Sequence, residues 1–247
     1  MEKLTANHIT VSFGEEKIID DITIRLGQGE LVCLLGVSGV GKSTLFNVIS
    51  GLLIPNQGTV MMDGQEITGE AGKVSYMLQK DLLLPFKTIV DNVSLPLVIR
   101  GRKKTDARAE AAKHFKEFGL EGTERKYPHQ LSGGMRQRAA LLRTYLFSDQ
   151  VALLDEPFSA LDTITKGTLH EWYLEVMDRI KLSTLFITHD IDEAIHLSDR
   201  IYIMTGKPGR ITAELHIRQS RPRSKDFIVS EEFMTYKKKI LEILEAT

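Results

Sequence analysis

The order of hydrophobic and polar positions divides the first part of the chain into strands and one helix. Residues 6–13 (ANHITVSF) and 21–26 (DITIRL) alternate apolar with polar side chains, which is typical of strands buried on one face. Residues 31–36 (LVCLLG) form an uninterrupted apolar run, which predicts a central strand. We expect a helix over residues 43–53, closed by a glycine, and a strand over residues 59–67.

The pattern changes after a further predicted strand over residues 73–79. From about residue 88 to residue 119 the chain has helical periodicity, with apolar side chains at every third position. The positions that would face a core are Ala109, Ala112, Phe115 and Phe118. We therefore expect a helical subdomain in this segment.

Strand and helix alternate again from Leu131 onward. A predicted helix is followed by apolar strands over residues 151–155, 184–188 and 200–204, with a second helix through Trp172 between the first two. This order predicts an α/β domain into which the helical subdomain is inserted. Near the end of the chain, Ser230 followed by two glutamates predicts the start of a last helix.

Composition narrows the class of protein. The 247 residues include 32 basic and 33 acidic side chains, so no overall charge attracts the chain to nucleic acid. A single cysteine, Cys33, excludes an internal disulfide framework and fits a reducing compartment. No stretch reaches the ~20 apolar residues that span a bilayer. The sequence therefore indicates a cytoplasmic protein that would contact a membrane only from outside.

The stretch GVSGVGKST matches the phosphate-binding pattern G-x-x-x-x-G-K-[ST] through Gly36, Gly41, Lys42 and Ser43. Its glycines allow the backbone to approach phosphates, the lysine adds a positive charge, and the serine hydroxyl can bind magnesium. The alternative is a glycine turn that caps a helix. The predicted strand before the motif and the predicted helix after it favour phosphate binding.

Polar side chains follow three of the predicted strands. Asp155 and Glu156 come at the end of residues 151–155, where one carboxylate could hold magnesium and the next could polarise an attacking water. His189 follows a later strand, and Gln79 ends an earlier one. Each of these side chains alone could have a structural role or simply be polar and exposed at the surface. Their common position at strand ends favours a site at the terminal phosphate.

A second candidate anion site lies in LSGGMRQR, residues 131–138. Ser132, Gly133 and Gly134 start a predicted helix, and free backbone N–H groups at such a start suit a phosphate. The two anion sites lie on opposite sides of the inserted subdomain, so one chain is not expected to bring both onto one nucleotide. A two-fold dimer could do so, with each chain completing the other's site.

In this order the motifs resemble the ATP-binding subunits of ATP-binding-cassette (ABC) transporters, over residues 1–217. The resemblance implies an α/β P-loop NTPase core of the ABC type: a mixed sheet flanked by helices, with an antiparallel β subdomain and an inserted helical subdomain. It places the core with its β subdomain in residues 1–87 and 132–217, the insert in 88–131, and a linker with a helix in 218–247.

The same resemblance implies ATP and Mg²⁺ as ligands, and a homodimer. Phe13, where many relatives have tyrosine, would stack on adenine, and Asp162 would communicate between the two sites. The implied catalytic residues are Glu156, His189 and Lys42, and the implied metal ligands are Ser43, Gln79 and Asp155. The implied nucleotide contacts are Phe13, Gly36, Ser38, Gly39, Gly41, Lys42, Ser43, Thr44, Gln79, Ser132, Gly133, Gly134 and Asp162.

The function implied is ATP hydrolysis that drives a transmembrane permease from the cytoplasmic face of the membrane. Short matches over residues 83–101 and 207–211 resemble importers of nitrate, sulfonate, taurine or related solutes, which work with a solute-binding protein. We expect the permease to dock on residues 85–100, with Phe86 either at that surface or in the subdomain core. A soluble ATPase acting on nucleic acid or ribosomes is the alternative, although no nucleic-acid partner is expected. A GTPase or kinase is disfavoured because the chain contains LSGG and lacks an Asn-Lys-x-Asp motif.

Overall fold

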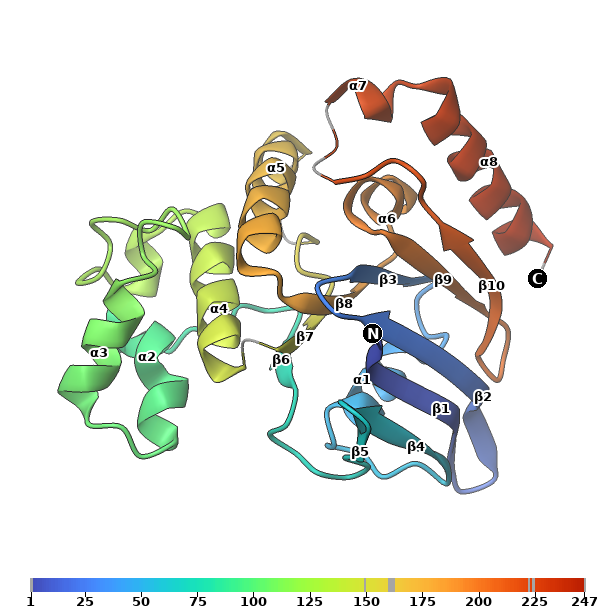
Figure 1. Cartoon of the computed structure of the whole chain (residues 1–247), viewed down its shortest axis with the longest axis horizontal. Helices are drawn as coiled ribbons and strands as arrows, with labels where there is room; N and C mark the ends of the chain where they lie inside the picture. Colours follow the sequence, from blue (N-terminus) through green and yellow to red (C-terminus); the bar gives the residue numbers. More distant parts are fainter. Residues whose placement is uncertain (1, 149, 160–162, 222, 224, 247) are drawn as a thin grey trace.

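The computed structural model describes residues 2–148, 150–159, 163–221, 223 and 225–246, without the side chains of residues 163–165 and 225. Its strands form two sheets (Figure 1). The smaller sheet is antiparallel and has the order β2-β1-β4-β5. Its strands are β1 (Glu2–Phe13), β2 (Glu16–Gly27), β4 (Gln57–Met62) and β5 (Gln65–Glu66).

Two predictions for this sheet need correction. The alternation over residues 6–13 and 21–26 marks only parts of β1 and β2, which are 12 residues long each. The strand expected over residues 59–67 is interrupted by a turn, because Asp63 and Gly64 have φ angles of 50° and 78°. Those left-handed angles reverse the chain, so β5 pairs back onto β4.

The larger sheet has the order β10-β9-β3-β8-β7-β6, and β9 and β10 alone form an antiparallel pair in it. All six residues of β3 are buried between β9 and β8, which confirms the central strand predicted from the apolar run. The predicted strand over residues 73–79 is shorter than expected, so Gln79 lies beyond its end. The strands are β3 (Leu31–Gly36), β6 (Ser75–Met77), β7 (Val151–Asp155), β8 (Ser183–Thr188), β9 (Arg200–Thr205) and β10 (Arg210–His216).

Alternate side chains of β3 point to opposite faces of the larger sheet. Val32 and Leu34 pack with α1 (Lys42–Ile49) and the antiparallel sheet in one hydrophobic cluster. Leu31, Cys33 and Leu35 pack in a second cluster with the remaining helices. These helices include α4 (Gly133–Phe147), α5 (Thr163–Ile180), α6 (Ile191–Leu197) and α8 (Glu231–Glu245), and the layered arrangement confirms the predicted α/β class.

The segment expected to form a helical subdomain contains α2 (Ile89–Ile99) and α3 (Lys104–Ala112), which lie with α4 at one end of the molecule (Figure 1). The predicted face of α3 is wrong, because Ala109 and Ala112 are exposed while Ala107 and Ala111 are buried. Phe115 and Phe118 are buried as expected, but they lie in turns after the helix and belong to the same cluster as the sheet. The proposed domain boundaries stay a prediction.

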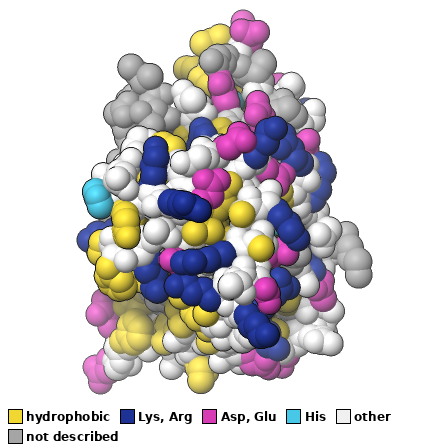
Figure 2. Space-filling model, turned by 90° about the vertical axis from the view of Figure 1, so that its left-hand side faces the viewer, with side chains coloured by type: hydrophobic (Ala, Val, Ile, Leu, Met, Phe, Trp, Pro, Cys, Tyr) yellow, Lys and Arg dark blue, Asp and Glu magenta, His cyan; other side chains and the backbone are white. Residues whose placement is uncertain are grey.

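The surface of this helical end carries lysine and arginine side chains with hydrophobic side chains between them (Figure 2). Residues 100–104 at the connection of α2 to α3 are all exposed, and four of these five are basic. Beyond the sheets the chain continues into α7 (Lys225–Ile228) and α8, whose first turn Ser230 caps by accepting a hydrogen bond from Phe233 N. Within the described ranges, every helix is too short or too polar to span a bilayer.

Candidate nucleotide site

The glycine loop connects the carboxyl end of β3 to the start of α1. A side chain at Gly36 would collide with the carbonyl oxygen of Met204 on the neighbouring strand β9. Gly41 has a φ angle of 106°, and a Cβ atom there would lie 2.5 Å from Ile19 Cγ2. Backbone conformation and tight packing therefore both require glycine at the ends of the loop, which fixes the backbone that surrounds the cavity.

Lys42 is the first residue of α1 and is only 7% exposed. Its Nζ donates to the carbonyl oxygens of Gly36 and Val37, both at 2.8 Å. Burial lowers the pKa of the Lys42 amine, while the carboxylates of Glu156 and Asp155 oppose that shift. The ammonium is thus held inside the loop by weak acceptors, and phosphate oxygens could replace these carbonyl groups.

Asp155 ends β7 opposite the start of α1. Ser43 donates its hydroxyl to Asp155 Oδ2 at 3.1 Å, and the hydroxyl of Tyr76 lies 3.4 Å from the same oxygen. Burial raises the pKa of the Asp155 carboxyl; the hydrogen bond from Ser43 opposes that shift and the charge of Glu156 adds to it. A hydroxyl and a carboxylate from two different elements are therefore adjacent at one edge of the cavity.

Glu156 follows with a φ of 46°, in the left-handed region that non-glycine residues rarely adopt. Its backbone N–H donates to Ile187 O at 3.0 Å, which anchors the residue to the end of β8. Such a conformation costs on the order of 1–3 kcal/mol and is found most often at functional sites. The strain places the side chain at the cavity instead of letting it continue the strand direction.

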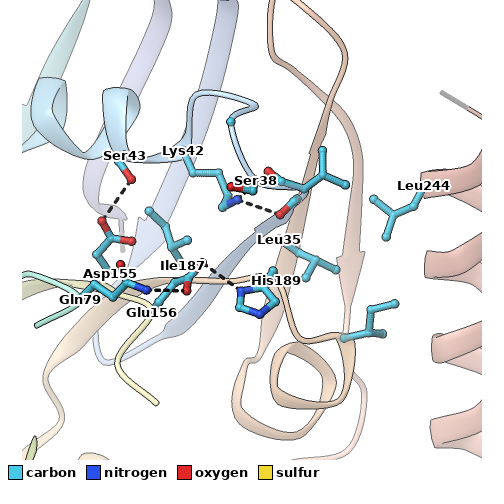
Figure 3. Close-up of a pocket in the computed structure, with 14 residues that line it drawn as sticks. Leu35, Ser38, Lys42, Ser43, Gln79, Asp155, Glu156, Ile187, His189 and Leu244 are labelled. Carbon is cyan, nitrogen blue, oxygen red and sulfur yellow. Dashed lines mark hydrogen bonds and ion pairs between the residues drawn. The ribbon is translucent and has the colours of Figure 1, made fainter. Parts of the chain in front are cut away.

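Two side chains hold the Glu156 carboxylate from opposite sides (Figure 3). His189 Nδ1 lies 3.0 Å from Oε1, and Gln79 Nε2 donates to Oε2 at 3.2 Å. Gln79 also donates to Ser159 Oγ at 3.3 Å. Gln79 and His189 follow β6 and β8, the two neighbours of β7, and converge on the carboxylate that follows β7, as expected where the carboxyl ends of parallel strands meet.

The glycine loop and these side chains enclose a cavity of about 600 Å³. Nine predicted site residues line it: Gly36, Ser38, Gly39, Lys42, Ser43, Gln79, Asp155, Glu156 and His189.

Other predicted site residues lie elsewhere. Phe13 ends β1 with 57% of its surface exposed and does not line the cavity, and neither Gly41 nor Thr44 does. Asp162 lies outside the described residues.

The sequence of residues 19–159 matches the family model for the ABC transporter. The chain belongs to the ABC transporter family. The formylaminopyrimidine import ATP-binding protein of Halalkalibacterium halodurans is 46% identical over 208 residues, which cover 84% of this chain and 81% of that protein. The aliphatic sulfonates import ATP-binding protein of Bacillus cereus strain ZK is 38% identical over 232 residues, covering 94% of this chain and 90% of that protein.

A solved ABC cassette has the same fold. The dimeric structure of a post-hydrolysis state of an ATP-binding cassette, bound to ADP and Pi, superposes with a TM-score of 0.73. It is 27% identical to this cassette, and the alignment covers 88% of this chain and all of that one. The chain is therefore an ATP-binding cassette ATPase, and the predicted fold class is confirmed.

The LSGG segment of the cassette does not reach the cavity of its own chain. Ser132 caps α4, where its Oγ accepts a hydrogen bond from Met135 N at 3.3 Å. Ser132 and Gly134 line a separate hollow of about 190 Å³ beside α5, and Gly133 lines neither. The structure thus separates the two predicted anion sites, as their positions in the sequence indicate.

Leu244 is a cavity residue that the sequence does not reveal. It lies near the end of α8 and lines the same cavity as the glycine loop (Figure 3). No motif surrounds it, and only the fold brings the last helix beside α6 and the loop. Ile191, the first residue of α6, also lines the cavity and was not predicted.

We predict that Asp155→Asn raises the melting temperature of the nucleotide-free cassette at pH 7. Because the folded state raises the pKa of this carboxyl above its ordinary value of 3.8, ionised Asp155 opposes folding. The contribution of this carboxyl to the free energy of unfolding is fully present below pH 3.8. It is lost as the pH rises through the folded-state pKa. Asparagine does not ionise, so the variant avoids that loss. The difference in melting temperature between the variant and wild type should therefore shrink at acidic pH.

Thermal unfolding followed by circular dichroism measures this effect. Asp178→Asn is the matched control. A hydrogen bond from Lys181 lowers the pKa of that exposed carboxyl, so removing the carboxylate should not raise the melting temperature. An equal or lower melting temperature for Asp155→Asn at pH 7 would show that burial of the carboxylate does not weaken the fold.

Proposed function

We propose that the cavity binds ATP and that its residues act as the sequence predicts. The observation that carries this proposal is the Glu156 carboxylate, held between His189 and Gln79 at the cavity whose other wall is the glycine loop. The loop amides and Lys42 would hold the phosphates. Phe13, exposed at the end of β1, would stack on the adenine ring.

The residues at the cavity edge fit magnesium. Ser43, Asp155 and Gln79 supply hydroxyl, carboxylate and amide oxygens, the hard ligands that Mg²⁺ prefers. No group of three or more His, Cys, Asp or Glu in the described ranges could hold a metal by itself. Protein ligands would therefore be shared with phosphate oxygens, which is usual for Mg²⁺ in nucleotide sites. When bound, the ion supplies positive charge that neutralises phosphate oxygens.

In hydrolysis Glu156 would orient and polarise the attacking water, because it is the carboxylate that faces the cavity without a serine partner. His189 contacts that carboxylate and would fix its direction relative to the terminal phosphate. Lys42 would stabilise negative charge that develops on the phosphate oxygens. Glu156 and His189 would therefore serve water activation, and Lys42 would serve charge stabilisation.

We further propose that the cassette works as a homodimer in which each LSGG completes the partner's site. The separation of Ser132 from the cavity within one chain supports this arrangement, and the dimeric cassette bound to ADP and Pi is of the same fold. Asp162, outside the described residues, would communicate between the two sites. ATP bound at the interface would stabilise the dimer, and hydrolysis would release it.

The dimer would drive a permease that imports a small solute. Support comes from two similar proteins, which are named as import ATP-binding proteins for formylaminopyrimidine and for aliphatic sulfonates. Nitrate, sulfonate, taurine or a related compound is the cargo class that we propose. The cassette would bind the permease at the cytoplasmic face of the membrane, and a solute-binding protein would deliver the cargo to that permease.

A second cavity supports the docking site for the permease. This groove of about 430 Å³ runs from the residues beside Gln79 to α2, and Leu78, Leu82 and Ile99 line it with 44%, 52% and 75% exposure. Exposed apolar side chains that lie together in one groove are typical of interaction surfaces. A permease helix in this groove would contact residues adjacent to Gln79, so nucleotide binding could alter the contact.

Phe86 needs a revised role in this proposal. It is 73% exposed in a turn before α2, so the alternative that it fills the subdomain core is wrong. It is not among the residues that line the groove. Ile99, at the end of α2, is the better position for testing the groove.

We predict that Ile99→Asp weakens copurification of the permease at least tenfold and leaves the ATPase rate of the isolated cassette unchanged. A buried aspartate in an apolar groove would have to be desolvated, which costs about 1–3 kcal/mol or more without a partner. The measurement is a pull-down from detergent-solubilised membranes beside an ATPase assay and solute uptake.

Ile54→Asp is the matched control, because Ile54 is 74% exposed and lies outside the groove. Phe86→Asp tests whether the docking surface extends to the turn before α2. Permease binding and uptake that stay at wild-type levels in Ile99→Asp would contradict docking in this groove.

A further inference from the structure

A buried ionic cluster is bonded to the segment that contains His189, and its three members, Glu193, Lys166 and His170, do not line the cavity. Glu193 on α6 is only 4% exposed, and its Oε1 lies 2.6 Å from Lys166 Nζ and 3.5 Å from His170 Nε2. Lys166 and His170 are four residues apart on α5, so both project from one face of that helix. Burying a carboxylate is costly unless it is paired, and here two basic side chains face it.

The same carboxylate fixes the backbone around His189. Its Oε2 accepts a hydrogen bond of 2.7 Å from the hydroxyl of Thr188, the residue before His189. That hydroxyl in turn accepts from the backbone N–H of Asp190, the residue after His189, at 3.0 Å. Asp190 caps α6 by accepting from Glu193 N at 3.2 Å. Both residues that flank His189 are therefore tied to Glu193.

Lys166 joins this segment to α5. Besides Glu193 it contacts Asp190 Oδ2 at 3.2 Å, so one ammonium bridges the two acidic residues that hold the turn. Burial would raise the pKa of Glu193, yet His170, Lys166 and Thr188 lower it to about 2, which keeps the carboxylate ionised at neutral pH.

We propose that Glu193 is a positioning residue for ATP hydrolysis, which holds the segment that presents His189 to the cavity and ties it to α5 through Lys166. His189 itself is 60% exposed, and among the described residues its side chain forms a hydrogen bond or ion pair with Glu156 alone, so polar contacts of the ring do little to fix its position. The orientation must come from the backbone, and Thr188, Asp190 and Glu193 determine that backbone. The inference rests on the proposed role of His189 in hydrolysis.

The test compares Glu193→Gln in the wild-type and in a His189→Ala background, with ATPase rates and ATP binding measured for each full-length chain. We expect Glu193→Gln to lower kcat roughly tenfold to hundredfold, because small misplacements of a catalytic group have such effects, and to leave KM for ATP within about twofold. In the His189→Ala background the same substitution should cause no further loss. Glu175→Gln, an exposed glutamate on α5, is the matched control.

The measured rates distinguish a positioning role of Glu193 from a general effect on folding and from a wrong role for His189. Wild-type kcat in Glu193→Gln, or an equal loss in both backgrounds, would overturn the proposal, since a general effect on folding does not depend on His189. A wild-type rate for His189→Ala alone would instead show that the proposed role of His189 is wrong. If Glu193→Gln does not fold, Thr188→Val and Thr188→Ser decide: valine should lower kcat and serine should restore it, and wild-type activity of the valine variant would overturn the proposal.

Discussion

Glu156→Gln is expected to lower ATP turnover by ~10²–10⁴-fold, equivalent to about 3–5 kcal/mol of barrier, because it removes the carboxylate that we propose polarises the attacking water. Glutamine keeps the length and shape of the side chain, so the contacts with His189 and Gln79 can be remade. The glycine loop and Lys42 lie on the other wall of the cavity and stay intact. Binding of ATP should therefore be unchanged while phosphate release almost stops.

The measurement combines steady-state ATPase rates with binding of ATP by filter retention or fluorescence. Glu66→Gln on β5 makes the same chemical change at an exposed position and should hydrolyse ATP at the wild-type rate. Near wild-type turnover in Glu156→Gln would refute the assignment of this carboxylate. Loss of both binding and turnover would show that Glu156 supports the cavity instead of acting on water.

Local patterns predict the parts of the site that depend on a single segment. The glycine loop can be predicted from residue type and from the strand and helix around it, because the phosphate binding proposed there would use the backbone of consecutive residues. Asp155, Glu156 and His189 could be placed together because parallel strands end at one edge of the sheet. These features need no knowledge of contacts between distant segments.

Features that depend on tertiary packing could not be predicted in this way. Alanine contributes little to hydrophobic periodicity, so the sequence selects Ala109 and Ala112, although packing buries Ala107 and Ala111. Leu244 lines the cavity only because α8 packs beside α6. The pairing of Glu193 with Lys166 joins two helices that are separated by β8, and neither residue belongs to a recognisable motif.

Ser132→Arg is expected to block ATP-dependent dimerisation and to leave ATP binding by the isolated chain intact. In a two-fold dimer each substitution appears at both composite sites, so two arginines replace two serines at positions where phosphate and LSGG should meet. We expect the dissociation constant of the ATP-bound dimer to rise at least ~100-fold, or about 3 kcal/mol. The cavity of the same chain is unaffected, because Ser132 does not line it.

Sizing chromatography with ATP tests this in the Glu156→Gln background, where the expected block of hydrolysis keeps ATP bound. Arginine also removes the cap of α4, which should cost about 1 kcal/mol of stability. Ser230→Arg is the matched control, since Ser230 caps α8 with the same bond, from Phe233 N at 3.2 Å. If the Glu156→Gln, Ser132→Arg chain still forms ATP-driven dimers, LSGG does not act on the partner's nucleotide. If the Ser230→Arg control also fails to dimerise, loss of a helix cap explains the result instead of the arginine at the composite site.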